Sequence, residues 1–331
     1  MLATGVVVGL ALVPAASSSS ASTSFYAGPA GRSIILPPRK GVLLGTAQSG
    51  VSESVPSQLA RLESTIGRKL DIEHRFMQRT CSLDVRVIRA ATRRGHIPMI
   101  SWFPDPAGGG QVLRGDADAC IQRVGRQIAS QPYRLLLRPY WEFNGDWMPW
   151  SKDLDGSLLT TAEFKRLWMR TIDRLRDGGA FPKASMVWCP SAGYYGSPNG
   201  ALDARASYPG DTYVDWVCAD DFNHVGDGVW REFADLFHSS RNVERDFRGR
   251  KPFLVGETGS IEDPTDSSRK GTWFRNARDY IKSSMPGMRA LVYFDVAYTD
   301  GDWRIGTTSS SLTGLRELAR DPYFDTRRLL R

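Results

Sequence analysis

The chain has 331 residues, of which 41% are hydrophobic and 24% are charged, and it carries a formal net charge of +7 at pH 7. This length and apolar content suffice for one large domain or two ordinary ones, and they exclude a chain that is disordered throughout. The basic residues are scattered, so we expect a solvated basic surface and no nucleic-acid partner, with an acidic cell-envelope polysaccharide as the alternative.

The N-terminus has the pattern of an export signal. Residues 1–24 contain an apolar run of about a dozen residues followed by small ones, which is too short to span a membrane comfortably. A basic segment before that run is missing, since the first basic residue is Arg32. We therefore expect a monomeric, secreted or cell-envelope protein with no membrane span in the mature chain. Its parts are a signal-like segment at 1–24, an extension at 25–40 and one domain at 41–331.

Strand and helix patterns alternate from residue 41 onward. Apolar runs of strand length stand at 41–48, 71–78, 97–102, 135–137, 186–188, 216–223, 253–255 and 290–294. Apolar residues at helical spacing follow most of these runs, and the last such helix carries Leu312, Leu315 and Leu318. About eight strand–helix repeats predict an α/β fold with a single (β/α)8 TIM barrel. A doubly wound sheet, the alternative, needs fewer strands.

Two local patterns between the strands are informative. Thr160 and Glu163 have capping-box spacing, which predicts the start of a helix. Its expected buried stripe, which places an indole in the core, is Phe164, Leu167, Trp168, Ile172 and Leu175. The glycine run 108–110 matches neither a phosphate loop nor a dinucleotide-binding fingerprint, so we expect an ordinary loop there.

The four cysteines permit two disulfides in an exported chain. Cys81 follows the second strand and Cys120 lies in a later helix, so we expect a surface bridge between them. Cys189 and Cys218 lie on neighbouring strands of the predicted barrel, where either a disulfide or two buried free thiols fits the pattern. The cysteines show no CxxC pair and no zinc-ligand spacing.

The stretch 133–150, YRLLLRPYWEFNGDWMPW, changes character where its strand ends. The buried run 135–137 is followed at once by polar and aromatic side chains, which are Arg138, Trp141, Glu142, Asn144, Trp147 and Trp150. An α/β barrel builds its working face in this way, at the carboxyl ends of its strands. Indoles stack on sugar rings while carboxyl and amide groups meet the hydroxyls. The alternative is a buried, ion-paired Glu in an aromatic loop.

A second stretch, KPFLVGETGS at 251–260, repeats the pattern with Glu257 at the end of an apolar strand. Glycoside hydrolysis needs two carboxyl groups across one bond, one protonated to release the leaving group and one ionised to attack. Two glutamates that end different strands of one barrel supply such a pair. With this second stretch, the sequence contains a candidate pair of catalytic carboxyl groups and not only one isolated acid.

Together, RPYWEFNGDWMPW, KPFLVGETGS and the closing VYFDV and DGDWRI segments resemble glycoside hydrolase family 26. The resemblance extends from about Gly41 to the C-terminus. It implies a secreted, retaining endo-β-glycanase with a (β/α)8 catalytic domain at 41–331. It further implies Glu142 as the acid/base, Glu257 as the nucleophile and β-1,4-mannan as the first substrate to consider.

Further residues are expected to bind the glycan. These are Trp102, Arg138, Trp141, Asn144, Trp147, Trp150, Asp220, Phe222 and Trp303. Asp220 and Asp221 are expected to bind hydroxyls or to orient Arg138, and Arg138 to keep Glu257 ionised. Burial and repulsion between the two glutamates should leave Glu142 protonated near neutral pH. For each Trp, packing in the core is the alternative.

Two positions depart from the family pattern. Mannanases of the family usually carry His immediately before the acid/base, where this chain has Trp141, and a Tyr near the end of strand 6, where it has Phe222. Mixed-linkage β-glucan and β-xylan are therefore alternative substrates, and a non-hydrolytic carbohydrate-binding barrel is an alternative of another class. We expect no metal and no cofactor, since neither an HExxH nor a GxSxG motif occurs.

Overall fold

Eight parallel strands pair in sequence order and close on themselves, because β1 pairs with both β2 and β8. The strands are β1 Leu43–Gln48, β2 Ile72–Met77, β3 Ile97–Trp102, β4 Leu135–Pro139, β5 Ala184–Trp188, β6 Trp216–Asn223, β7 Phe253–Ser260 and β8 Met288–Asp295. The computed structural model describes residues 35–48, 54–197, 199–224, 228–237, 242–298 and 301–326. The predicted signal-like segment and Arg32 lie outside these ranges. The predicted (β/α)8 barrel is confirmed.

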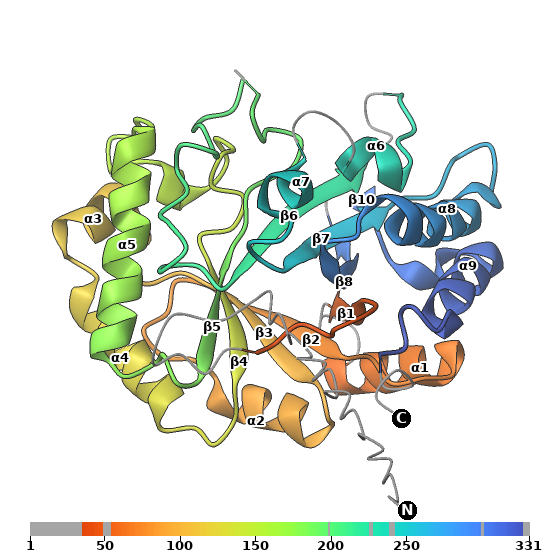
Figure 1. Ribbon diagram of the computed structural model, residues 1–331, viewed down its shortest axis with the longest axis horizontal. Helices are drawn as coiled ribbons and strands as arrows, with labels where there is room; N and C mark the ends of the chain where they lie inside the picture. Colours follow the sequence, from red (N-terminus) through yellow and green to blue (C-terminus); the bar gives the residue numbers. More distant parts are fainter. Residues whose placement is uncertain are drawn as a thin grey trace, which may run out of the picture.

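Helices surround the strands on the outside of the barrel (Figure 1). They are α1 Val55–Ile66, α2 Val85–Arg93, α3 Gly109–Arg114, α4 Asp118–Ala129, α5 Thr161–Asp177, α6 Phe233–Phe237, α7 Val243–Phe247, α8 Arg269–Ser284 and α9 Ser309–Arg320. Short 3-10 turns lie at η1 Pro149–Ser151 and η2 Ile305–Thr307, and a two-stranded hairpin pairs β9 Ala297–Tyr298 with β10 Gly301–Asp302. Within the described ranges, no helix is both long and apolar enough to cross a membrane.

Helix α5 forms as its sequence predicts. The Thr160 side chain accepts the backbone N–H of Glu163, and the Glu163 side chain accepts the backbone N–H of Thr160. The predicted apolar stripe of this helix is buried throughout, and Trp168 lies in the core. The capping box and the apolar stripe each involve only residues close together in the sequence, which is why the sequence alone predicts this helix.

The glycine run at 108–110 is not the loop that we expected, because α3 begins at Gly109. A Cβ at Gly109 would overlap the backbone of Trp150, and one at Gly110 would overlap the side chain of Asp153. The glycines therefore let the start of this helix pack directly on the loop after β4. The spacing of apolar residues gives no sign that two backbone segments pack this closely, so the sequence did not predict the helix.

The chain reaches the barrel before residue 41. The backbone N–H of Ile35 donates to Ser185 Oγ at 2.7 Å, and the Trp216 indole donates to the Ile35 carbonyl at 2.9 Å. Ser185 and Trp216 lie at the start of β5 and β6. Residues just ahead of 41 thus contact the N-terminal end of the barrel, opposite to the end where the candidate site lies.

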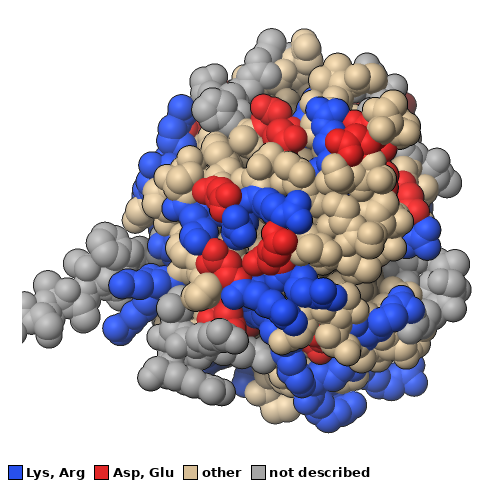
Figure 2. Space-filling model, turned by 90° about the vertical axis from the view of Figure 1, so that its right-hand side faces the viewer, with Lys and Arg blue, Asp and Glu red and all other residues tan. Residues whose placement is uncertain are grey.

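Basic and acidic side chains are interleaved on the face formed by α8 and α9 (Figure 2). Arg275 pairs with Glu317 across these helices at 2.6 Å, and Lys282 pairs with Asp321 at the same distance. Exposed pairs of this kind add little to the free energy of unfolding. They do neutralise part of the basic excess locally, in agreement with a solvated basic surface.

Candidate active site

The end of β4 carries the first carboxylate in an unusual backbone conformation. Tyr140 and Glu142 have φ values of 53° and 52°, in the left-handed region that residues other than glycine seldom adopt. The backbone N–H of Glu142 donates to the Cys189 carbonyl at 2.8 Å, which holds this turn against the end of β5. Such conformations persist where surrounding structure enforces them, and they gather at functional sites.

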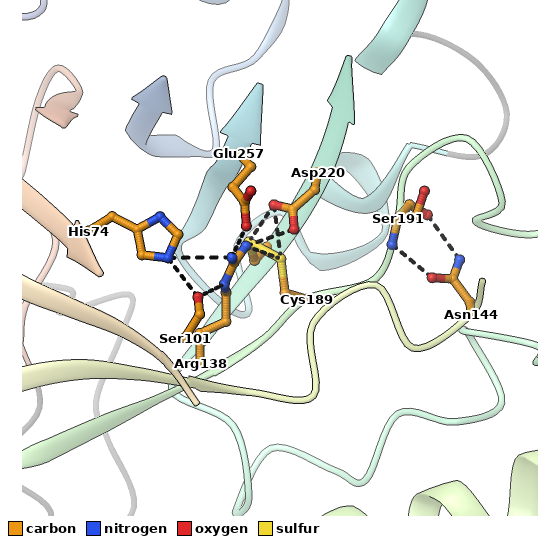
Figure 3. Close-up of a disulfide and its surroundings, with 9 residues drawn as sticks. His74, Ser101, Arg138, Asn144, Cys189, Ser191, Asp220 and Glu257 are labelled. Carbon is orange, nitrogen blue, oxygen red and sulfur yellow. Dashed lines mark hydrogen bonds and ion pairs between the residues drawn. A yellow bond between two sulfur atoms is a disulfide. The ribbon is translucent and has the colours of Figure 1, made fainter. Parts of the chain in front are cut away.

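The second carboxylate lies within β7, and a buried cation holds it in place. Glu257 is in register with Asp220 of β6, and Arg138 of β4 pairs with both (Figure 3). Arg138 Nη1 lies 2.7 Å from Asp220 Oδ2, and Arg138 Nη2 contacts Glu257 Oε1. The guanidinium is fully buried, so these charge-assisted bonds operate where water screens them least.

Neutral groups complete the surroundings of Arg138. Arg138 Nε donates to Ser101 Oγ at 2.7 Å, and His74 Nε2 lies 2.6 Å from the same oxygen. Burial, together with the charge of Arg138, lowers the pKa of His74 well below its ordinary value, so His74 adds no second cation. Gly256 makes room for the pair, because a Cβ there would overlap Cys218 Sγ and lie 2.7 Å from Arg138 Nη1.

Both predicted cysteine pairs form disulfides. Cys81 is bridged to Cys120, as expected, and Cys189 is bridged to Cys218, so the alternative of two free thiols is wrong. The second bridge joins the end of β5 to β6 directly below the carboxylates, with Cys189 Sγ 3.3 Å from Asp220 Oδ1. It thus ties the end of β5 to β6, the strand that carries the ion-paired Asp220.

A cavity of about 1620 Å³ opens at the carboxyl ends of the strands, and Glu142 and Glu257 both line it. Residues from the ends of β1, β2, β6 and β8 contribute to its wall, among them Gln48, Phe76, Asp220 and Phe294. Its volume exceeds the roughly 300–1,000 Å³ of a pocket for a compact small molecule. The space therefore suits an extended ligand.

The environments of the two glutamates differ. Burial, together with the charge of Glu257, raises the pKa of Glu142 to about 7, although a hydrogen bond from Trp147 opposes the rise. Burial also raises the pKa of Glu257, but here the directly bound Arg138 opposes it. Because the cation contacts Glu257 and not Glu142, the negative charge of the pair belongs on Glu257. Near neutral pH the two glutamates thus form a pair of one acid and one carboxylate.

The structure separates the predicted glycan-binding residues into two groups. Those that line the cavity are Trp141, Trp147, Trp150, Asp220, Phe222 and Trp303. Among these, Trp147 is 46% exposed at the rim, and its indole donates to Glu142 Oε2 at 2.9 Å. Those outside the cavity wall are Trp102, Arg138 and Asn144.

The residues outside the wall support it from behind. The Trp102 indole is fully buried and donates to the Thr80 carbonyl at 2.9 Å. The Asn144 amide is buried and bonds the backbone of Ser191 twice, accepting at 2.7 Å and donating at 2.9 Å (Figure 3). Asn144 thereby fastens the loop after β4 to the loop after β5. Asn144 itself is fully buried, so here it supports the wall and does not form its surface.

The two positions that depart from the family pattern are filled by packed aromatic rings. Trp141 has its ring centroid 4.6 Å from that of Trp150 and 5.6 Å from that of Phe76. Phe222 lies 5.4 Å from Trp303 and 5.6 Å from Phe294 in the same measure. A phenyl ring at 222 offers no hydrogen bond to Glu257, so Arg138 is left to orient this carboxylate.

Several residues of the cavity wall were not predicted from the sequence. Phe76 and Phe294 stand near the ends of β2 and β8, and the rule that strand ends form the working face would have found them. Tyr194, Arg79 and Arg231 come from loops. No periodic pattern marks those three, so only the folded chain reveals them.

Comparison with known proteins agrees with this geometry. The model of glycosyl hydrolase family 26 matches residues 99–285. Endoglucanase H of Acetivibrio thermocellus is 29% identical over 274 residues, which cover 80% of this chain but only 29% of that protein. The chain therefore spans under a third of the length of this curated relative.

Solved structures share the fold at lower identity. A mannanase from Bacillus subtilis is 19% identical with a TM-score of 0.59, and the match covers 85% of each chain. A modular endo-beta-1,4-mannanase from Cellulomonas fimi is 18% identical with a TM-score of 0.62, covering 86% of this chain and 71% of that one. Because the family model matches more than half of its length, this chain belongs to glycosyl hydrolase family 26.

Proposed function

We propose that the chain hydrolyses a β-linked polysaccharide internally and with retention of configuration, using Glu142 as acid/base and Glu257 as nucleophile. The observation that carries this proposal is the asymmetry of the two glutamates. Both line one cavity, but only Glu257 contacts the buried Arg138, while the pKa of Glu142 is raised to about 7. Double displacement needs this division between an ionised and a protonated carboxyl group.

The proposed reaction has two steps. Glu257 attacks the anomeric carbon while Glu142 gives its proton to the glycosidic oxygen, and the leaving sugar departs. The charge of Glu257 then passes into a covalent bond, which removes one cause of the raised pKa of Glu142. Glu142, now ionised, takes a proton from the water that hydrolyses the intermediate. Retention requires about 5–5.5 Å between the two carboxyl groups.

The substrate that we consider first is β-1,4-mannan, because structures of mannanases share the fold and the volume of the cavity suits a polysaccharide chain. A second candidate is mixed-linkage β-glucan. It is favoured by the 29% identity to a protein named as an endoglucanase and by Trp141 in place of the His usual in mannanases of the family. The two sugars differ in the direction of their 2-hydroxyl group, which the site must discriminate beside the cleaved bond.

We also propose that the chain acts outside the cytoplasm. The apolar run within residues 1–24 and two disulfides both fit an exported protein, since disulfides persist mainly in oxidising compartments. Fractionation of the producing cells tests this directly. Recovery of the full-length chain only from the cytoplasm, with reduced cysteines, would contradict it.

The experiment that tests the catalytic proposal measures reducing sugars released from mannan, lichenan and xylans by four proteins. Wild type and the control Glu317→Gln, an exposed glutamate on α9, should cleave the same substrate equally. Glu142→Gln should lower kcat by about 10²- to 10⁴-fold, the usual contribution of a general acid, and Glu257→Ala should abolish cleavage.

Product stereochemistry completes the test. Proton NMR during the first minutes should show the β-anomer, as retention requires. If both substitutions leave cleavage intact, or if the first product is the α-anomer, the assigned roles are wrong. Binding to a glycan without release, unchanged by Glu257→Ala, would favour a carbohydrate-binding barrel instead.

A further inference from the structure

Asp221 is a carboxylate of the cavity wall that the proposed mechanism does not use. Its neighbour on β6, Asp220, pairs with Arg138. Asp221 lines the cavity, and its Oδ1 accepts the backbone N–H of Phe222 at 2.9 Å. Within the ranges that the structure describes, no side chain forms an ion pair with it.

Gly193 keeps the other oxygen of Asp221 open. The segment before it is fixed to β6, because the N–H of Ala192 donates to the Asp220 carbonyl at 2.8 Å. A Cβ at position 193 would lie 3.5 Å from Asp221 Oδ2, in van der Waals contact. Glycine therefore leaves a space next to this oxygen, and Gly193 itself lines the cavity.

The Asp221 carboxylate belongs to the side of the cavity that holds the proposed acid. Tyr194, next to Gly193, has its ring centroid 5.4 Å from that of Trp147, and Trp147 donates to Glu142 Oε2. Gly193, Tyr194 and Trp147 thus form a continuous wall from Asp221 to Glu142. In the proposed reaction the acid protonates the oxygen that stays with the leaving sugar, so this wall faces that sugar.

We infer that Asp221 is a specificity-determining residue that accepts a hydrogen bond from a hydroxyl of the leaving-group sugar, in the space left by Gly193. This inference rests on the proposed function, because it takes Glu142 as the acid. Burial raises the pKa of Asp221 to about 7, so its ionised form prevails above neutral pH, and in that form the bond that it accepts from a hydroxyl is charge-assisted and stronger than one between neutral groups. The charge of Asp221 also contributes to the raised pKa of Glu142, so an experiment must separate binding from this electrostatic effect.

Two substrates with the same glycone distinguish binding of the hydroxyl from the electrostatic effect on Glu142. One is a β-linked oligosaccharide cleaved by wild type, whose leaving group is a sugar. The other is the benzyl glycoside of the same glycone, whose alcohol leaving group needs the same protonation but carries no further hydroxyl. Asp221→Ala should lower kcat/KM for the oligosaccharide by about 10- to 100-fold, the range for a hydrogen bond to a charged group, and change the benzyl glycoside by less than about threefold.

Two further variants control for structure and for charge. Gly193→Ala, whose added methyl makes only ordinary contacts, should lower kcat/KM for the oligosaccharide alone. Asp146→Asn removes an exposed charge from the same loop as Glu142 without touching the cavity wall, so it should change neither substrate. Thermal melting followed by circular dichroism confirms that each variant is folded.

The outcomes are distinct. Equal losses on both substrates, or no loss on either, would overturn the role of Asp221, since an electrostatic or structural effect does not depend on the leaving group's hydroxyls. Cleavage that survives in Glu257→Ala would instead overturn the proposed function. If Glu257→Ala is inactive and Asp221→Ala resembles wild type, only the present inference fails.

Discussion

Replacing Trp147 by Phe should move the basic limb of the pH profile of kcat/KM to higher pH. The indole N–H donates to Glu142 Oε2 at 2.9 Å, which stabilises the ionised form and lowers the pKa of Glu142 against burial. The Phe ring keeps most of the stacking surface and removes only the donor. Without that bond the proton should bind Glu142 more tightly, so the acid should stay active to higher pH.

The magnitude follows from the strength of one hydrogen bond to a charged group. Such a bond contributes about 1.5–3 kcal/mol, which corresponds to about 1–2 pKa units at 1.36 kcal/mol per unit. Trp147 is 46% exposed, so water can replace part of what the indole supplies. We therefore expect an upward shift of about 0.5–1 unit, starting from a pKa of about 7.

The assay is kcat/KM on one oligosaccharide between pH 4 and pH 10, because its limbs report the essential groups of the free enzyme. Trp230→Phe is the matched control: this indole donates to Glu232 Oε1 at 2.8 Å, and neither residue lines the cavity. It should leave both limbs in place. A basic limb that stays fixed or moves down in Trp147→Phe would refute either the role of Glu142 as the acid or the effect of this bond upon it.

Two further predictions concern stability. Burial disfavours the charged form of His96, but hydrogen bonds to Glu63 and Glu73 outweigh burial and raise its pKa above 6.5. The stabilisation from protonated His96 is therefore full below about pH 6.5 and is lost as pH rises through the folded-state pKa. His96→Gln should accordingly lower the free energy of unfolding in urea more at pH 6 than at pH 9. An equal loss at the two pH values would contradict this. Replacing Cys81 and Cys120 by Ser opens a loop with a sequence separation of 39 and should lower the free energy of unfolding by about 2–4 kcal/mol, whereas an unchanged urea midpoint would show that the bridge does not constrain the unfolded chain.

The sequence by itself determined the barrel and the two carboxylates. Buried strands show as short apolar runs, helices show as stripes and caps, and each pattern depends only on near neighbours, as α5 with Thr160 and Glu163 illustrates. Glu142 and Glu257 could be singled out because each stands within a few residues of the end of an apolar run of strand length. In a parallel barrel the carboxyl ends of all strands meet at one face, so the two positions converge whatever the details of packing.

Tertiary structure alone decided which side chains reach the cavity. Trp102 and Trp147 both stand at or after the carboxyl end of a predicted strand. Trp102 is nevertheless buried behind the cavity wall, whereas Trp147 is exposed at its rim. Asn144 turned to the backbone of Ser191, and the role of Gly193 beside Asp221 appears only once β5 and β6 are in register. The direction of a side chain depends on strand phase, register and loop contacts between residues far apart in the chain, and no pattern of near neighbours encodes these.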